Sequence, residues 1–212
     1  FSFQNHSDYH MLKPIFVCLV LVLLVSCSTI QKETHHTPIY SQSIEQRISQ
    51  LNALNKWKIS GKIAFIQSKK RESASIHWHI DESSQQLDLT SYLGINVLHL
   101  SSKNESHHLK VDGKSYQTND LDNLIESLTG FPLPTKALSS WIKGLAFDTK
   151  DTITYSEENK LPKVLTSYYQ NRIWQIEYRK YSNIEGYQLP TSLQIKHDDL
   201  TIKIAINQWT IN

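Results

Sequence analysis

The chain has few cysteines and few glycines, and its charges nearly cancel. Its two cysteines, Cys18 and Cys27, both precede the part with regular hydrophobic patterns, so the body of the protein has neither a disulfide nor a thiol nucleophile. The nearest two of its six glycines, Gly130 and Gly144, are 14 residues apart, which excludes a G-x-G-x-x-G loop and a P-loop. With 22 basic and 20 acidic residues, the net charge of +2 offers no broad basic field, and we expect no nucleic-acid partner.

The apolar run near the start is too short to cross a membrane. Ile15–Val25 has 11 residues, whereas a transmembrane helix needs about 20. The run follows Met11 and Lys13, an arrangement typical of a secretory signal peptide, and Met11 is the expected start of translation. It ends in Leu-Val-Ser-Cys27, which resembles the bacterial lipobox; the alternative is an ordinary signal peptide that happens to contain a cysteine.

The lipobox resemblance divides the chain into three parts. It implies that residues 1–26 are upstream residues and a lipoprotein signal peptide, and that Cys27 is lipidated. Serine rather than aspartate follows the cysteine, which implies an anchor in the outer membrane, facing the periplasm. Residues 27–42 are polar and are predicted to be the lipidated N-terminus and a flexible tether. Residues 43–212 are predicted to form a single domain.

Alternating polar and apolar residues predict that most of this domain consists of antiparallel strands. Ser43 and Gln46 fit a capping box that opens one helix, and from Lys56 onward the apolar residues recur with period two. The polar segments between the strands are expected to be turns: residues 68–73, 81–86, 112–113 and 198–199. One face of each strand is therefore expected to be buried and the other exposed.

Helical spacing interrupts the strands once. Asn119 or Asp120 is expected to cap a helix that Gly130 ends, and a second short helix is expected to end at Gly144. Strands on both sides of these helices imply an α+β fold, in which the helices cover one face of an antiparallel sheet.

Several motifs resemble those of the LolB family of outer-membrane lipoprotein receptors. Residues 128–134 match L-T-G-x-P-x-P, residues 138–145 match L-x-x-W-I-x-G-L, and the other matches are Trp78, Leu93-Gly94, Trp174 and Ile202–Trp209. The resemblance implies a strongly curved, unclosed half-barrel of antiparallel strands, with helices over its open side and an apolar cavity for acyl chains between them. It also implies a receptor that accepts lipoprotein cargo from the periplasmic carrier LolA and inserts it into the inner leaflet of the outer membrane.

The resemblance implies two functional regions. A membrane-insertion loop would consist of Tyr92, Leu93, Gly94 and Ile95, with Tyr92 standing where the family commonly has a proline. From the residues alone, Leu93 fits a turn and a buried strand end equally well. The candidates for the acyl-chain cavity are Ile76, Trp78, Leu138, Trp141, Ile142, Leu145 and Trp174. Without the resemblance, apolar residues at strand spacing usually indicate ordinary core.

Other functions have little support in the sequence. His77 and His79 share one strand face, but no third ligand is near them, and we expect no metal and no cofactor. No H-E-x-x-H or G-x-S-x-G motif occurs, and we expect no catalytic residues and no enzyme activity. We expect a monomer. The alternative function is a lipid-anchored envelope protein that binds a lipid or peptide without transferring it.

Overall fold

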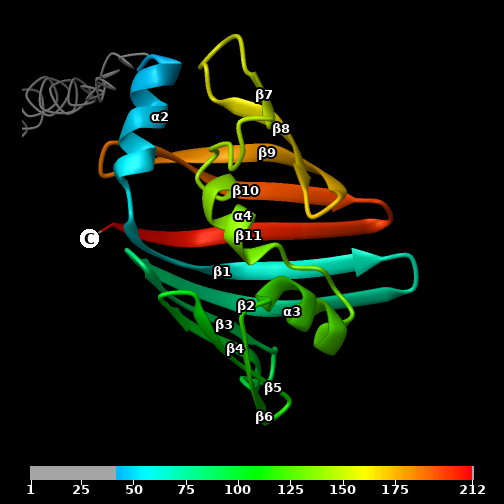
Figure 1. The fold of residues 1–212 in the computed structure, drawn as a ribbon. Coiled ribbons are helices and arrows are strands. Elements are labelled where there is room, and N and C mark those ends of the chain that lie inside the picture. Colours follow the sequence, from blue (N-terminus) through cyan, green and yellow to red (C-terminus); the bar gives the residue numbers. More distant parts are fainter. Residues whose placement is uncertain (1–41, 212) are drawn as a thin grey trace, which may run out of the picture. The chain divides into compact units, whose positions relative to one another are not determined.

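The structure is a computed structural model that describes residues 42–211, and its main feature is one antiparallel sheet of 11 strands. The strand order is β6-β5-β4-β3-β2-β1-β11-β10-β9-β8-β7, so the sheet extends in both directions from the central pair β1 and β11 (Figure 1). The strands are β1 (Lys56–Gln67), β2 (Lys70–Asp81), β3 (Ser84–Thr90), β4 (Asn96–Lys103), β5 (Ser106–Val111), β6 (Lys114–Thr118), β7 (Thr152–Tyr155), β8 (Pro162–Tyr169), β9 (Arg172–Ile184), β10 (Tyr187–His197) and β11 (Leu200–Ile211).

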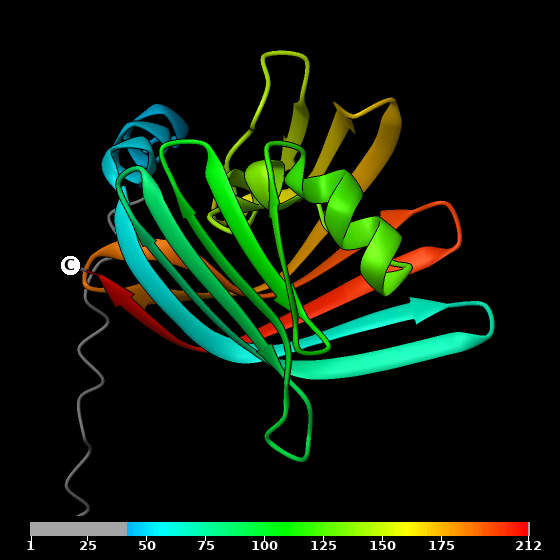
Figure 2. The ribbon, with the colours of Figure 1, turned by 60° about the horizontal axis from the view of Figure 1, so that its bottom comes forward.

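The sheet is strongly curved and does not close. Its edge strands, β6 and β7, each pair on one side only. The helices α3 (Leu121–Thr129) and α4 (Thr135–Trp141) lie on the concave side, and α2 (Ile44–Ala53) lies at one end, next to β10 (Figures 1 and 2). This confirms the α+β half-barrel with helices over its open side.

The long strands have one buried and one exposed face, as the period of two predicted. In β1, Trp57, Ile59 and Ile63 are buried, whereas Lys58 and Lys62 between them are exposed. The buried residues face α3 and α4, so the polar residues lie on the convex face. Burial of one face only is typical of an antiparallel sheet covered on a single side.

The hairpin turns follow the sequence signals, with two corrections. Asp112 and Gly113 have φ angles of +50° and +77°, as a tight two-residue hairpin turn requires. The turns predicted over residues 68–73 and 81–86 are shorter, because only two residues separate the strands at each place. The ends of long hairpins extend beyond the core, so both faces are solvated there and polar composition does not mark the end of a strand.

Gly61 is required where β1 and β11 come close together. A Cβ atom at this position would lie 2.1 Å from the carbonyl oxygen of Ala205. The pairing register shifts between Ser60 and Gly61, where β11 has an extra residue. A bulge of this kind bends the strand and increases its twist, which contributes to the curvature of the sheet.

The helix ends match the predicted signals in part. Ser43 Oγ accepts a hydrogen bond from Gln46 N (3.2 Å), and Ser43 N donates to the Gln46 side chain (3.2 Å), which confirms the capping box on α2. Gly130 ends α3 with a left-handed φ of +75°. Asp120 occupies the N-cap of α3 but makes no capping hydrogen bond with its side chain. Among residues 42–211, no helix has both the length and the apolar character needed to span a bilayer.

Candidate functional site

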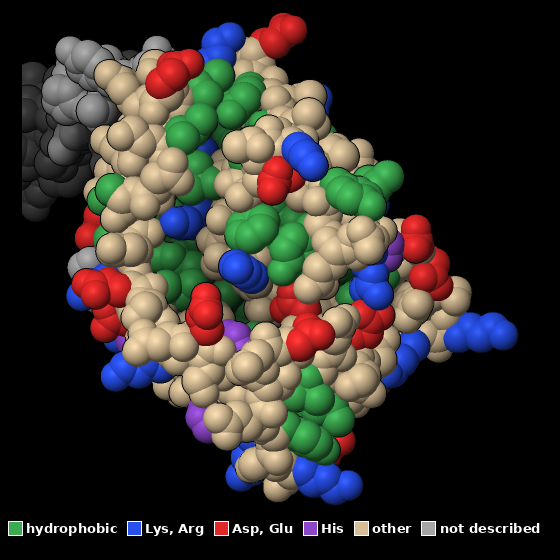
Figure 3. Space-filling view, in the orientation of Figure 1, with side chains coloured by type: hydrophobic (Ala, Val, Ile, Leu, Met, Phe, Trp, Pro, Cys, Tyr) green, Lys and Arg blue, Asp and Glu red, His purple; other side chains and the backbone are tan. Residues whose placement is uncertain are grey.

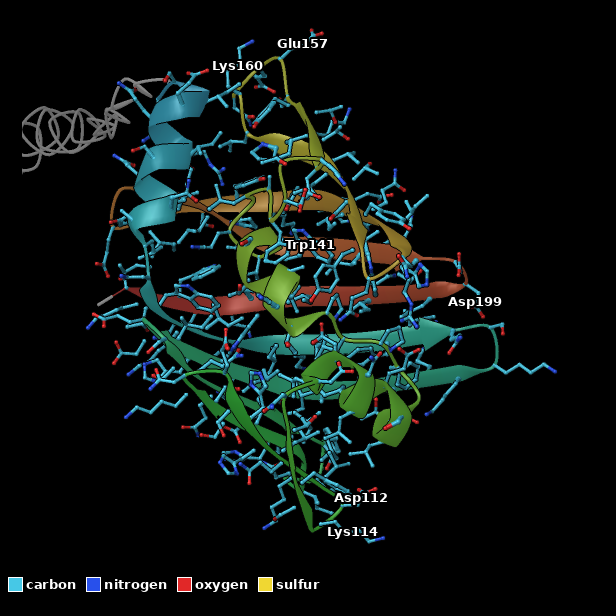
Figure 4. All side chains as sticks on the ribbon, viewed as in Figure 1. Asp112, Lys114, Trp141, Glu157, Lys160 and Asp199 are labelled. Atoms are coloured by element: carbon cyan, nitrogen blue, oxygen red, sulfur yellow. The ribbon has the colours of Figure 1, made fainter. Side chains whose placement is uncertain are left out.

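An aromatic and aliphatic core fills the space between the sheet and the two helices α3 and α4. Trp141 of α4 lies over the middle of the concave face (Figure 4), with its ring centroid 5.9 Å from that of Trp174 and 6.2 Å from that of Tyr169. The seven cavity candidates are at most 4 % exposed and belong to this one core: Ile76, Trp78, Leu138, Trp141, Ile142, Leu145 and Trp174. The structure therefore brings them together, but as packed side chains.

Asp122, near the start of α3, is buried and connects the two helices to the sheet. Its carboxylate accepts hydrogen bonds from the backbone N and Oγ of Thr135 (3.0 and 2.8 Å) and from the hydroxyl of Tyr169 (3.0 Å). Burial raises the pKa of Asp122, and burial together with the nearby Asp122 charge raises the pKa of Tyr169. These contacts, the Asp122 network, fix α3, α4 and β8 relative to one another.

Arg47 and Lys143 connect α2 to the turn after α4. The Arg47 guanidinium donates to the carbonyl oxygens of Gly144 (3.1 Å), Lys143 (2.8 Å) and Gln188 (3.0 Å). Lys143 Nζ donates to the carbonyl oxygens of Leu51 (2.9 Å) and Leu54 (3.0 Å), so a cation satisfies the C-terminal end of α2. Burial lowers the pKa of Lys143 to about 8.

A polar cavity of about 880 Å³ opens beside the concave core, between α3, α4 and the ends of neighbouring strands. The carboxylates of Glu82, Glu105, Asp120 and Asp122 line it. On this face of the molecule, charged side chains lie around hydrophobic ones at α4 (Figure 3). Because Tyr169 lines the cavity and also packs against Trp141, this cavity adjoins the apolar core.

The loop between β3 and β4 exposes three apolar side chains. Tyr92 is 99 % exposed, Leu93 79 % and Ile95 62 %, so Leu93 is not the buried end of a strand. The loop projects on the side of the sheet opposite to α3 and α4, at the bottom of Figure 2. Its exposed apolar tip therefore lies on the convex side, away from the polar cavity.

Hydrogen bonds hold the loop without the proline that the resemblance led us to expect before Leu93. Ser91 N donates to the carbonyl of Ile95 (2.8 Å), and Gly94 N donates to the carbonyl of Ser91 (2.9 Å). Gly94 has a φ of +79°, which favours glycine. At the base, Asp88 accepts a hydrogen bond from the Asn96 side chain (3.0 Å). The loop is thus a closed turn with its apolar side chains directed outward.

Comparison with known proteins settles the family. The sequence profile of the family described as "Outer membrane lipoprotein LolB" matches residues 55–209. The Outer-membrane lipoprotein LolB of Pseudoalteromonas translucida is 30 % identical over 99 % of this chain and 100 % of its own length. That of Aeromonas hydrophila is 33 % identical over 95 % of this chain and 98 % of its own. The chain belongs to the LolB family.

Solved structures support the fold of this LolB family member. A LolA superfamily protein from Nitrosomonas europaea has a TM-score of 0.54 at 8 % identity, covering 79 % of this chain and 93 % of its own. A putative outer membrane lipoprotein-sorting protein domain from Vibrio parahaemolyticus has a TM-score of 0.50 at 5 % identity, covering 78 % of this chain and 91 % of its own. At these identities the likeness shows the fold alone.

The LolB family motifs form the cover of the concave face. Residues 128–134 end α3 and form the link to α4, and residues 138–145 form the second half of α4 and the turn after it. In that turn Gly144 has a φ of +75°, and a Cβ there would lie 2.9 Å from Arg47 Nη2. The motif thus combines apolar residues that fill the core with a glycine that lets Arg47 approach the backbone.

No local sequence signal marks the buried polar residues that hold this cover. Asp122 stands in the first turn of a helix, where an acidic residue is usually solvated and favoured by the helix dipole. Arg47 lies on the buried face of α2, and no feature of the local sequence identifies the carbonyl groups that it reaches. Cys27 lies outside the described residues. Within them, no three His, Cys, Asp or Glu side chains group as a metal ion would need.

Proposed function

We propose that this LolB family member is the outer-membrane receptor that accepts lipoproteins from the periplasmic carrier LolA and inserts them into the inner leaflet. The observation that carries the proposal is the loop tip, where Tyr92, Leu93 and Ile95 are all more than 60 % exposed. Single exposed apolar residues are common, but three on one projecting loop are typical of a surface that contacts a membrane. The loop and the helical cover lie on opposite sides of the sheet (Figure 2). Cargo entry and membrane contact therefore use different surfaces.

The need for a receptor follows from the cargo. Moving an acyl chain into water costs about 0.8 kcal/mol per CH₂, or roughly 12 kcal/mol for a chain of sixteen carbons. A lipoprotein therefore needs an apolar receiving site before it leaves the carrier. Within residues 42–211, the apolar core under α3 and α4 offers such a site.

The acyl chains enter when α3 and α4 move away from the sheet. The cavity candidates are packed together in this structure, so a chain gains space only by displacing part of the cover. Trp141 supports this route, because its indole N–H is buried and has no acceptor among residues 42–211. A carbonyl group of an incoming acyl linkage would supply that acceptor.

Relative affinities set the direction of transfer. The glycine spacing excludes the common nucleotide-binding loops. The transfer of cargo in this proposal requires no chemical step. Cargo moves from the carrier to the receptor and then to the bilayer because each site binds acyl chains at least as well as the one before it. Lipidation of Cys27 keeps the receptor beside that bilayer, since two or more acyl chains anchor a protein stably.

A two-step transfer assay tests the proposal. Carrier loaded with radiolabelled lipoprotein is mixed with the chain carrying Cys27→Ala, and the label on each protein is measured after they are separated. Liposomes are then added, and the label that floats with them is measured. A receptor takes the label from the carrier and releases it to liposomes. If the chain does not take the label from the carrier, the proposal is wrong. If it takes the label but does not release it to liposomes, the alternative function is supported: an envelope protein that binds a lipid without transferring it.

A further inference from the structure

The convex face of the sheet has a shallow groove beside the loop. Its volume is about 360 Å³, and it crosses β2, β1, β11, β10 and β9. Small side chains form its floor: Ala64, Ser75, Ser192 and Ala205. Tyr92 of the loop lines one end, so the groove and the apolar tip are parts of one continuous surface.

The charged residues that line this groove are all cations. Lys62, Lys203 and Arg179 are exposed, and no carboxylate is among the lining residues. Lys62 pairs with Ala205 and Lys203 with Ala64, so the two lysines are diagonal neighbours on one face of the β1–β11 ladder. Such neighbours are about 7–8 Å apart, a spacing at which like charges repel and an anion between them is stabilised.

The other charges of the convex face do not neutralise these lysines. Within residues 42–211, neither Lys62 nor Lys203 forms a salt bridge. Glu177, the carboxylate nearest to the groove along β9, already binds Lys196 (2.6 Å) and Arg179 (3.6 Å). The positive charge is local, because the net charge of the whole chain is only +2.

The direction of the loop determines what faces this groove. The loop projects on the convex side (Figure 2), so insertion of its tip into a bilayer brings the convex face against the lipid headgroups. Tyr92 would lie at the headgroup level, which suits a ring with a polar hydroxyl. Phospholipid phosphates are then the nearest anions to Lys62 and Lys203.

We propose that the convex face of the sheet lies on the membrane surface, and that Lys62, Lys203 and Arg179 bind the phosphate groups of anionic phospholipids there. The inference rests on the proposed function, because it takes the loop as the membrane contact. It adds the orientation of the protein on the membrane and the lipid chemistry that the groove recognises. The concave face and its polar cavity then face the periplasm, where the carrier arrives.

Vesicle flotation tests the inference. The chain carrying Cys27→Ala is mixed with vesicles of phosphatidylcholine and phosphatidylglycerol, or of phosphatidylcholine alone. A lysine beside an anionic membrane strengthens binding about fivefold, so Lys62→Gln with Lys203→Gln should weaken binding to the mixed vesicles about 30-fold. Binding to phosphatidylcholine alone should change much less. The matched control is Lys136→Gln with Lys160→Gln, which removes two exposed lysines and should leave binding unchanged. Lys136 lines the polar cavity on the concave side, and Lys160 lies in the loop between β7 and β8, at the top of Figure 4.

The outcomes separate this inference from the proposed function. If the Lys62/Lys203 variant floats with mixed vesicles as the parent does, or if the Lys136/Lys160 control weakens equally, the inference is wrong. Leu93→Glu should weaken binding to both kinds of vesicle, because it acts through the apolar tip. If Leu93→Glu alone has no effect, the insertion step of the proposed function fails instead. Thermal unfolding of each variant confirms that it is folded.

Discussion

Replacing Leu93 by glutamate tests the loop most directly. The side chain is 79 % exposed and lies outside the apolar core. The substitution leaves the Asp122 network, the concave core and the polar cavity unchanged. We therefore expect the variant to fold and to accept lipoprotein from the carrier, but to release it slowly to liposomes.

The size of the effect follows from the exposed fraction. Full burial of a leucine side chain contributes about 1.5–3 kcal/mol, so burying the exposed 79 % at a membrane interface contributes about 1.2–2.4 kcal/mol. Because about 1.4 kcal/mol is a factor of ten, delivery should fall roughly 7- to 50-fold. The added charge resists burial and makes this a lower limit. The free energy of unfolding should change by less than about 0.5 kcal/mol, as is usual for a surface substitution.

The assay measures release of labelled lipoprotein from loaded receptor to liposomes, together with urea unfolding of the same preparation. Ala53→Glu is the matched control, because it adds the same charge at an exposed apolar position of α2, outside the loop and the convex face of the sheet. It should release cargo at the parental rate. Normal delivery by Leu93→Glu would show that the loop is not the insertion device. A loss of more than about 2 kcal/mol in unfolding free energy would show that Leu93 contributes to the core.

Three further predictions concern the anchor, the sheet and the helix α2. The intact mass of the mature protein should correspond to a chain that begins at Cys27 and carries lipid, and an unmodified thiol there would contradict the anchor. Gly61→Ala should lower the free energy of unfolding by more than about 2 kcal/mol, because the new Cβ would lie 2.1 Å from the Ala205 carbonyl oxygen. If the free energy from urea unfolding stays within about 1 kcal/mol of the parent's, β1 and β11 can move apart at little cost. Burial lowers the pKa of Lys143 from 10.5 to about 8. Between these two pH values the unfolded chain binds more protons than the folded chain, so the contribution of Lys143 to the free energy of unfolding rises with pH. Lys143→Met should lack this rise in urea unfolding measured across that range, and parallel curves for the two chains would refute the pKa shift.

Local patterns predicted the elements of this protein well. The alternation around Trp57, Ile59 and Ile63 depends only on the two faces of a strand, and the structure buries these residues as expected. Ser43 with Gln46, Gly130 and the Asp112–Gly113 turn are signals carried by neighbouring residues, and each is found where the sequence places it. For Leu93, the residues alone left exposure and burial equally open. The family resemblance then favoured exposure.

Long-range packing decided the rest. The pairing of β1 with β11 joins strands from opposite ends of the domain. Asp122 is a buried acceptor for Thr135 and Tyr169 only because α3, α4 and β8 pack together in the folded chain. The family resemblance also implied the seven cavity candidates as a group, but whether they enclose space or fill it depends on how α3 and α4 fit the sheet. The side of the sheet to which the loop points was likewise fixed by curvature. A strand pattern specifies which residues share a face, whereas the bending of the whole sheet determines whether a hairpin loop lies on its concave or its convex side.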